Sequence, residues 1–172
     1  LWAYARTFPG IVAAYEMCGF LYLKESIDKA VAKLEAPDLI GVSCYIWNWE
    51  WSKEFAKTVK KKFPQCTIVA GGVQIPANDI TFMTNHRYFD FAIYGEGEGA
   101  FADFLLARRL EKERGYGDCK SLIETKTQIL GGLRFHSRRD FVDLEKLRSP
   151  YLDGVFEIGC GQGGSLQMWK QR

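Results

Sequence analysis

The chain has 172 residues, of which 47% are hydrophobic and 26% charged, as is ordinary for a single soluble globular domain. Its net charge of +2 is too small an excess to indicate nucleic-acid binding. No apolar run in the sequence approaches the roughly 18 residues that a membrane span requires, and no signal peptide is visible. We therefore expect neither a nucleic acid nor a membrane among its partners.

The five cysteines stand far apart in the sequence. An odd number without a closely spaced pair argues against a disulfide framework and against a zinc or iron–sulfur site. Reduced thiols are typical of cytoplasmic proteins, so we expect a cytoplasmic location. The cysteines are Cys18, Cys44, Cys66, Cys119 and Cys160.

The first predicted elements alternate between helix and strand. Residues 11–23 are apolar and aromatic, and they fit either a strand or a short helix. Ser26 is a good N-cap for a helix that Pro37 ends, and residues 39–45 then indicate a buried strand. The apolar spacing along residues 48–63 predicts an amphipathic helix.

The same alternation continues to about residue 116. The sequence TIVAGG, from Thr67 to Gly72, predicts a strand, and an unclear stretch separates it from a strand at Phe91–Tyr94. A strongly apolar stripe over residues 99–113 predicts a helix that Gly115 ends. Strands and helices in alternation imply right-handed parallel crossovers, and so an α/β fold with an open, mainly parallel sheet and helices on both faces.

The pattern changes after residue 116. Residues 127–141 suggest a small hairpin around Gly131 and Gly132, and an irregular connector follows it. The glycine-rich end of the sequence is typical of a linker or a frayed tail. We therefore expect an α/β domain at 1–116, a hairpin and connector at 117–157, and a tail at 158–172.

Three loops at successive strand ends are candidates for a binding site. Ligands of open parallel sheets bind beyond the carboxyl ends of the strands, where here the sequences SCYIWNW, GGVQIP and GEGEG occur. Glycine in such loops lets a large flat group lie directly on the backbone. The glycines are Gly71, Gly72, Gly95, Gly97 and Gly99, and the aromatic residues beside them are Tyr45, Trp47 and Trp49.

The polar residues of these loops indicate a neutral ligand. Glu96 and Glu98 stand at a predicted helix N-terminus, where they complement the helix dipole but would repel a bare diphosphate. Asn48 and Gln74 can exchange paired hydrogen bonds with amides. The spacing therefore speaks against a dinucleotide fingerprint and favours a ligand rich in hydroxyls or carboxamides.

Each of these features also has a purely structural explanation. Two glycines after a strand often form only a tight turn, an acidic first turn often only caps a helix, and a cluster of Trp residues often belongs to the core. His86 and His136 have no partner at a spacing typical of metal ligands, so we expect both to be structural or surface residues.

Four segments in order carry a family resemblance: PDLIGVSCYIWNWEWS, KFPQCTIVAGGVQIP, FDFAIYGEGEGAF and DLEKLRSPYLDGVFE. Together they resemble the cobalamin-binding domain that precedes the catalytic barrel of cobalamin-dependent radical S-adenosylmethionine enzymes. The resemblance implies a flavodoxin-like sheet, with cobalamin on the strand-end loops and Gly71 and Gly72 leaving room for its nucleotide tail. The cofactor-binding residues that it implies are Ser43, Tyr45, Trp47, Asn48, Gly71, Gly72, Val73, Gln74, Pro76, Gly95, Glu96, Gly97 and Glu98.

The sequence also departs from related patterns. The D-x-H-x-x-G loop, whose His ligates cobalt in other cobalamin domains, is absent, and so is the C-x-x-x-C-x-x-C motif of an iron–sulfur cluster. Residues 1–5, LWAYA, resemble the middle of the family's first helix, so we expect the family's first strand to lie upstream of Leu1. We therefore expect a cobalamin-binding module of a methyltransferase-like radical enzyme, as a fragment or a reduced relative. The cluster, S-adenosylmethionine and the barrel would then belong to a full-length parent or a partner chain, and the module would not be catalytic alone.

Two other interpretations stay open at this stage. The chain could be a non-enzymatic flavodoxin-like interaction domain, or a remnant that has lost cofactor binding. A phospho-acceptor version of such a domain would need a Lys after its last strand, which the visible strand ends lack. A flavin or nucleotide binder on the same sheet is the third interpretation, against which Glu96 and Glu98 already weigh.

Overall fold

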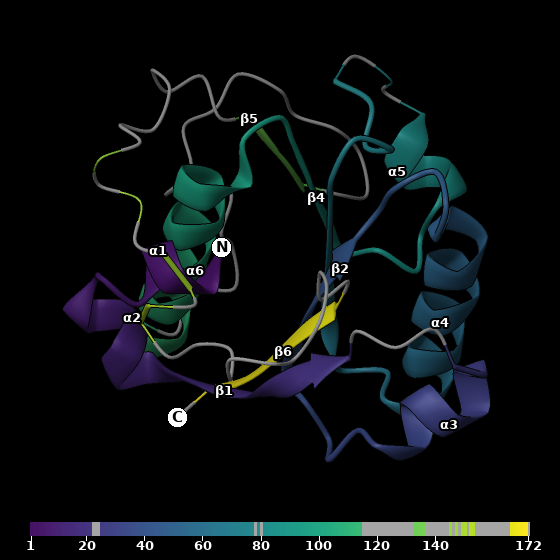
Figure 1. The fold of residues 1–172 in the computed structure, drawn as a ribbon, viewed down its shortest axis with the longest axis horizontal. Coiled ribbons are helices and arrows are strands. Elements are labelled where there is room, and N and C mark those ends of the chain that lie inside the picture. Colours follow the sequence, from purple (N-terminus) through teal and green to yellow (C-terminus); the bar gives the residue numbers. More distant parts are fainter. Residues whose placement is uncertain are drawn as a thin grey trace.

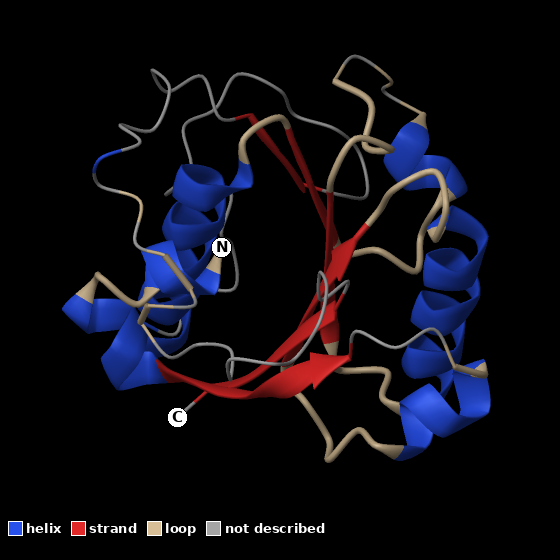
Figure 2. Cartoon of the chain, viewed as in Figure 1, coloured by secondary structure: helices blue, strands red, loops and turns tan. Residues whose placement is uncertain are grey.

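The computed structural model describes residues 1–21, 25–77, 79, 81–114, 133–136, 145, 147, 149, 150, 152, 153 and 166–171. In these residues one sheet of six strands lies between two groups of helices (Figures 1 and 2). None of the described helices is long and apolar enough to cross a membrane.

The observed elements follow the predicted alternation closely, and the ambiguous segment 11–23 divides into the end of a helix and a strand. The helices are α1 (Trp2–Ala5), α2 (Pro9–Ala14), α3 (Ile27–Ala32), α4 (Trp49–Lys62), α5 (Phe82–Asn85) and α6 (Gly97–Arg114). The strands are β1 (Tyr15–Leu21), β2 (Leu39–Ser43), β3 (Thr67–Gly71), β4 (Phe91–Tyr94), β5 (Leu133–His136) and β6 (Leu166–Gln171).

The sheet has the strand order β1-β6-β2-β3-β4-β5. Strands β2 to β5 pair in parallel, each with the next one along the chain. Strand β6 runs antiparallel to both of its neighbours, β1 and β2. The predicted α/β fold, with a mainly parallel sheet and helices on both faces, is therefore confirmed.

The prediction of an irregular tail over 158–172 is wrong for Leu166–Gln171, because these residues form β6, which lies between β1 and β2 in the sheet. The glycines at 159–164 suggested a linker, but residues 166–171 form a strand because they pair with the backbone of both β1 and β2. Two strands that do not pair with each other need a partner between them, and local sequence pattern does not show which distant segment supplies it.

The predicted hairpin around Gly131 and Gly132 is described only in part. Its segment Leu133–His136 is a strand, but it pairs in parallel with β4 at the edge of the main sheet. The turn and the other arm of the hairpin lie outside the described residues, as does most of the predicted connector.

Alternation along the strands separates two cores. Ile68 and Ala70 of β3 point toward α3, α4 and α5, where Phe55 and Val59 pack against them. Val69, between them, points to the other face, which α1, α2 and α6 cover. Figure 1 shows these helix groups on opposite sides of the sheet.

The second face is closed by α6. Its Phe101, Phe104 and Leu105 are fully buried, and the buried hydroxyl of Tyr15 in β1 donates a hydrogen bond of 3.1 Å to the Leu105 carbonyl. This bond links the middle of α6 to β1 and so limits how far the helix can slide along the sheet. The first turn of α6 is thereby held over the carboxyl ends of the strands.

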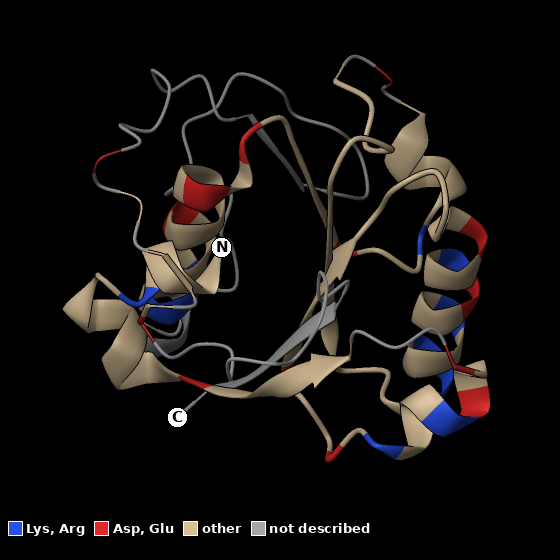
Figure 3. Ribbon diagram, in the orientation of Figure 1, with Lys and Arg blue, Asp and Glu red and all other residues tan. Residues whose placement is uncertain are grey.

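At the amino-terminal ends of β3 and β4, the Asp90 carboxylate links the sheet to α4. Asp90 accepts a hydrogen bond of 2.7 Å from the Ile68 N–H at the start of β3, and the Lys60 ammonium from the end of α4 lies 2.6 Å from the same oxygen. Lys60 also donates to the Cys66 carbonyl at 2.6 Å. Figure 3 shows many further charged residues along α4.

Asp90→Ala should destabilise the fold, because it removes a charged acceptor from a backbone N–H and a partner from Lys60. We expect the free energy of unfolding to fall by about 1–3 kcal/mol in urea denaturation. Glu54→Ala is the matched control, since Glu54 pairs with Lys57 on the exposed side of α4 and should show no measurable change. Equal losses in the two variants would contradict the assignment of Asp90.

Stability should also fall at high pH, because two cysteine thiols are buried. Burial raises the pKa of Cys44 and of Cys66 to about 12, from an ordinary value of 9.0. Above that ordinary value the unfolded chain binds fewer protons than the folded chain, so the free energy of unfolding falls as pH rises from about 9 toward 12. Urea denaturation between about pH 8 and 10 should show the decline, and Cys66→Ala should make it shallower.

Candidate functional site

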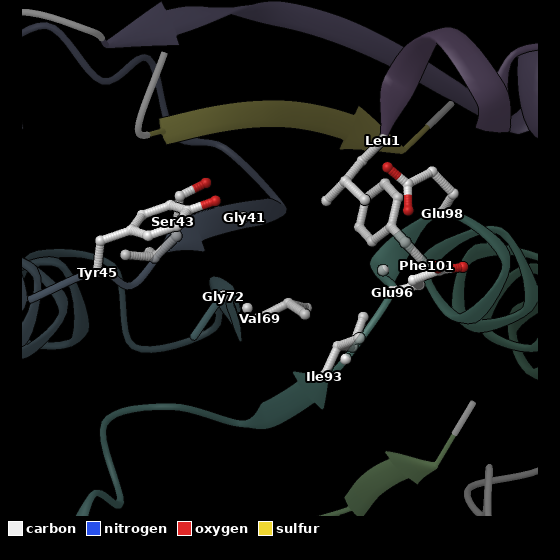
Figure 4. A pocket seen from close by; sticks show the side chains of 14 residues that line it. Leu1, Gly41, Ser43, Tyr45, Val69, Gly72, Ile93, Glu96, Glu98 and Phe101 are labelled. Carbon is white, nitrogen blue, oxygen red and sulfur yellow. The ribbon is translucent and has the colours of Figure 1, made fainter. Parts of the chain in front are cut away.

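A cavity of about 340 Å³ lies where the carboxyl ends of β2, β3 and β4 meet the first turns of α6. In Figure 4, Ser43 and Tyr45 lie on one side of it and Glu96, Glu98 and Phe101 on the other. The lining residues are Leu1, Gly41, Val42, Ser43, Tyr45, Val69, Gly71, Gly72, Ile93, Gly95, Glu96, Gly97, Glu98 and Phe101.

The floor of the cavity is the sheet face beneath α6. Gly71 stands two residues after Val69 in β3, so both residues face the cavity. Gly41 of the adjacent strand β2 also lines the cavity. A Cβ placed on Gly71 would meet nothing nearer than the Ile93 carbonyl oxygen, at 3.8 Å. The space above this glycine is therefore available to a ligand, which can touch the backbone of two adjacent strands.

Gly72 is closely approached by the neighbouring loop, while its backbone still lines the cavity. Its φ is +110°, and a Cβ there would lie 2.6 Å from the carbonyl oxygen of Cys44. The Cys44 N–H donates to the Gly71 carbonyl at 2.6 Å, and the Gln74 N–H donates to the Cys44 carbonyl at 3.2 Å. The direction in which a side chain at Gly72 would point is thus filled by the neighbouring loop, and the role of this glycine beside a cofactor tail stays a prediction.

The loop after β2 is shaped by Asn48. This residue is buried, its side-chain oxygen accepts from the Tyr45 N–H at 2.8 Å, and its amide nitrogen donates to the Ser43 carbonyl at 2.7 Å. Both ends of the amide are used within the loop. The result is a tight turn that presents Tyr45 and Trp47 as a stacked pair, with ring centroids 4.7 Å apart and planes 6° from parallel.

The acidic side of the cavity is the start of α6. Glu96 is exposed and Glu98 is half-buried, and both line the cavity beside Gly95 and Gly97. Gly95 has a φ of +72°, so it makes the turn from β4 into the helix. Carboxylates at this position can accept hydrogen bonds from hydroxyl or amide groups, and their charge disfavours a nearby diphosphate.

The structure brings most of the predicted site residues together. Those that line the cavity are Ser43, Tyr45, Gly71, Gly72, Gly95, Glu96, Gly97 and Glu98. Those that do not line it are Trp47, Asn48, Val73, Gln74 and Pro76. Of the latter, Trp47 and Val73 are 68% and 76% exposed on the same edge of the sheet, so they form an apolar rim outside the cavity.

Sequence reasoning missed several lining residues. Gly41 had a readable signal, because a glycine inside a strand often marks the close approach of a ligand or another backbone. Val69, Ile93 and Phe101 had none, since an apolar residue in a strand or a helix stripe looks the same whether it meets the core or a cavity.

Trp49 and His86 belong elsewhere. Trp49, predicted as a possible wall of the site, packs against Phe82 and Phe89 on the α4 side of the sheet. His86 stacks on Phe82 in the same cluster, and its Nδ1 lies 2.8 Å from the Phe82 carbonyl oxygen. Among the residues that the structure describes, no group of His, Cys, Asp and Glu is arranged to hold a metal ion.

Two curated methyltransferases are similar to this chain. A cobalamin-dependent radical SAM methyltransferase, TokK, from Streptomyces tokunonensis is 32% identical over 155 residues, which is 90% of this chain. A 2-(S-pantetheinyl)-carbapenam-3-carboxylate methyltransferase from Streptantibioticus cattleyicolor is 33% identical over 105 residues, or 61% of this chain. The chain spans 22% of the length of the first relative and 15% of the second.

A family model described as the B12 binding domain matches residues 14–105. The match covers more than half of the chain, from the end of α2 through β4 and into α6. It therefore includes every loop around the cavity. The chain belongs to the B12-binding domain family, and it is similar to the B12-binding domains of cobalamin-dependent radical SAM methyltransferases.

Proposed function

We propose that this domain holds cobalamin on the loops at the carboxyl ends of β2, β3 and β4, with the nucleotide tail in the cavity and the corrin over its rim. The observation that carries the proposal is the open floor of the cavity, where the space above Gly71 is unfilled and Gly41 of the adjacent strand lines the same cavity. Such a floor suits a broad ligand edged with amides, because its contacts are made through backbone N–H and C=O groups.

The size of the cavity supports this division of the ligand. A volume of about 340 Å³ is near the lower end of the range for small-molecule pockets, which is about 300–1,000 Å³. A corrin ring with its nucleotide tail is larger than such a pocket, so only part of cobalamin can enter. The remainder would rest on the exposed apolar rim, which Ile46, Trp47 and Val73 provide.

The negative charge of the cavity favours cobalamin over the flavins and dinucleotides that could bind to a similar sheet. Glu96 and Glu98 would accept hydrogen bonds from ribose hydroxyls and side-chain amides of cobalamin. A flavin mononucleotide or a dinucleotide would bring a phosphate monoester or a diphosphate toward these carboxylates, at a greater cost in Coulomb energy than the single phosphodiester charge of the cobalamin tail. This argument favours cobalamin over the flavin or nucleotide alternative.

The activity of the whole protein follows only by analogy with the two relatives. We infer that the domain serves a radical S-adenosylmethionine methyltransferase, whose barrel and iron–sulfur cluster lie beyond these residues or in a partner chain. Cobalamin would supply the group-transfer chemistry when bound. This chain's part would be to hold and orient the cofactor, and to shield the side that faces the sheet from water.

Retention of the cofactor tests the proposal directly. When the purified chain is mixed with hydroxocobalamin and desalted, we expect the visible absorption of the cofactor to elute with the protein at about one equivalent. Riboflavin 5′-phosphate treated in the same way should not be retained. If neither compound stays with a folded chain, the interaction-domain interpretation replaces this one.

Gly71→Val tests the floor of the cavity. Because a Cβ at Gly71 has free space and valine is favourable in a strand, thermal stability should change little, while cobalamin affinity should fall by about tenfold or more. Lys57→Gln, on the outer surface of α4 across the sheet, is the control and should keep full affinity.

Gly72→Ala, in contrast to Gly71→Val, should lower the thermal stability of the fold, because its Cβ would collide with the Cys44 peptide.

A further inference from the structure

Asn48 stands where the loop after β2 meets the helix α4. It is the N-cap residue of α4, and its carbonyl accepts a hydrogen bond of 2.8 Å from the Ser52 N–H. An asparagine at an N-cap ordinarily accepts a further bond through its side-chain oxygen, from a backbone N–H in the first turn of the helix. The Asn48 side chain makes no such bond. Helix α4 therefore begins without the side-chain cap that this residue type could supply.

The side chain of Asn48 is instead bonded within the loop. Its Oδ1 accepts from the Tyr45 N–H at 2.8 Å, and its Nδ2 donates to the Ser43 carbonyl at 2.7 Å. The backbone N–H of Asn48 also donates to the Tyr45 carbonyl, at 3.2 Å. Asn48 is only 8% exposed, so a lost bond here would leave a buried polar group unpaired. The hydrogen bonds of this side chain thus favour the shape of the loop over the stability of the helix.

The two residues that the Asn48 side chain holds are residues that line the cavity. Ser43 and Tyr45 line it together on the β2 side, whereas Asn48 does not line it (Figure 4). The Tyr45 ring is also stacked on Trp47, which is 68% exposed. Because most of the Trp47 side chain lies in solvent, the protein around it does little to hold the stacked pair. The backbone turn that Asn48 shapes therefore sets the position of both rings.

The loop and the helix place different demands on position 48. At neutral pH an aspartate has acceptors but no donor, so it could not donate to the Ser43 carbonyl and would repel that oxygen. At the start of α4, however, aspartate caps as well as asparagine, and its charge complements the helix dipole. The helix can therefore use either residue, while the loop needs both a donor and an acceptor.

We propose that Asn48 is a positioning residue for the cofactor, which acts through the Tyr45–Trp47 pair without touching the ligand. This role differs from the direct contact between amides that the sequence predicts for Asn48. The inference rests on the proposed function, because it takes Tyr45 as a wall of the cobalamin site. It adds that the affinity of this wall for the ligand depends on a buried amide behind it.

Asn48→Asp in the full chain tests the inference. The midpoint of thermal unfolding should change little, because the capping ability is kept, while affinity for hydroxocobalamin should fall by about tenfold or more. In NMR spectra recorded without cofactor, the nuclear Overhauser effects between the rings of Tyr45 and Trp47, whose centroids lie 4.7 Å apart, should be lost. In a Tyr45→Ala background, Asn48→Asp should cost less than about threefold in affinity, because no ring remains to be placed.

Asn85→Asp is the matched control. It makes the same change of charge at an exposed residue of α5, on the other face of the sheet, and should leave stability, affinity and the ring signals unchanged. A loss of affinity in Asn48→Asp that this control shares would be an effect of net charge, and it would overturn the inference.

Three further results would overturn it. One is full affinity in Asn48→Asp, and another is an equal loss with and without the Tyr45 ring. If Asn48→Asp does not fold, Asn48→Ser decides by the same measurements, since serine is also a good cap. Failure of both variants to fold is the third contrary result, because Asn48 would then serve the fold. If the unaltered chain retains no cobalamin, the proposed function fails. The ring signals alone then decide, and their persistence in Asn48→Asp contradicts the positioning role.

Discussion

The backbone contact between Cys44 and Gly72 is the constraint on which the site depends. It joins the loops after β2 and β3 through two main-chain hydrogen bonds, and it leaves no room for a side chain at Gly72. The Asn48 amide then fixes the remainder of the first loop from inside. These main-chain contacts therefore fix the loops that carry Tyr45 and Gly72 relative to each other.

The two cores place the cavity on one face of the sheet. The face toward α3, α4 and α5 is filled by a continuous apolar cluster. On the other face the cluster stops below the carboxyl ends of the strands, where Gly41 and Gly71 replace larger residues and α6 begins. Phe101 closes the deep end of the cavity while Glu96 stays in solvent at its mouth.

Local pattern was sufficient to predict most of this fold and the position of the site loops. The strands at 39–43, 67–71 and 91–94 and the helix at 49–62 could be predicted from the spacing of apolar residues and from turn residues, whereas α5 falls in a stretch that the sequence left unclear. The carboxyl ends of the three strands located the three loops. What local pattern could not show was pairing over long distances. The identity of β6 depends on backbone groups more than a hundred residues away, and the role of Gly72 depends on a carbonyl in another loop.

A floor made of main chain has a consequence for selectivity. Peptide groups of adjacent strands have no rotamers to adjust, and a substitution at Gly41 or Gly71 can only fill the space and not reshape it. Under the proposed binding mode, discrimination between related macrocycles would arise around the entrance, at Tyr45, Trp47 and Glu96, whose side chains can vary without disturbing the sheet.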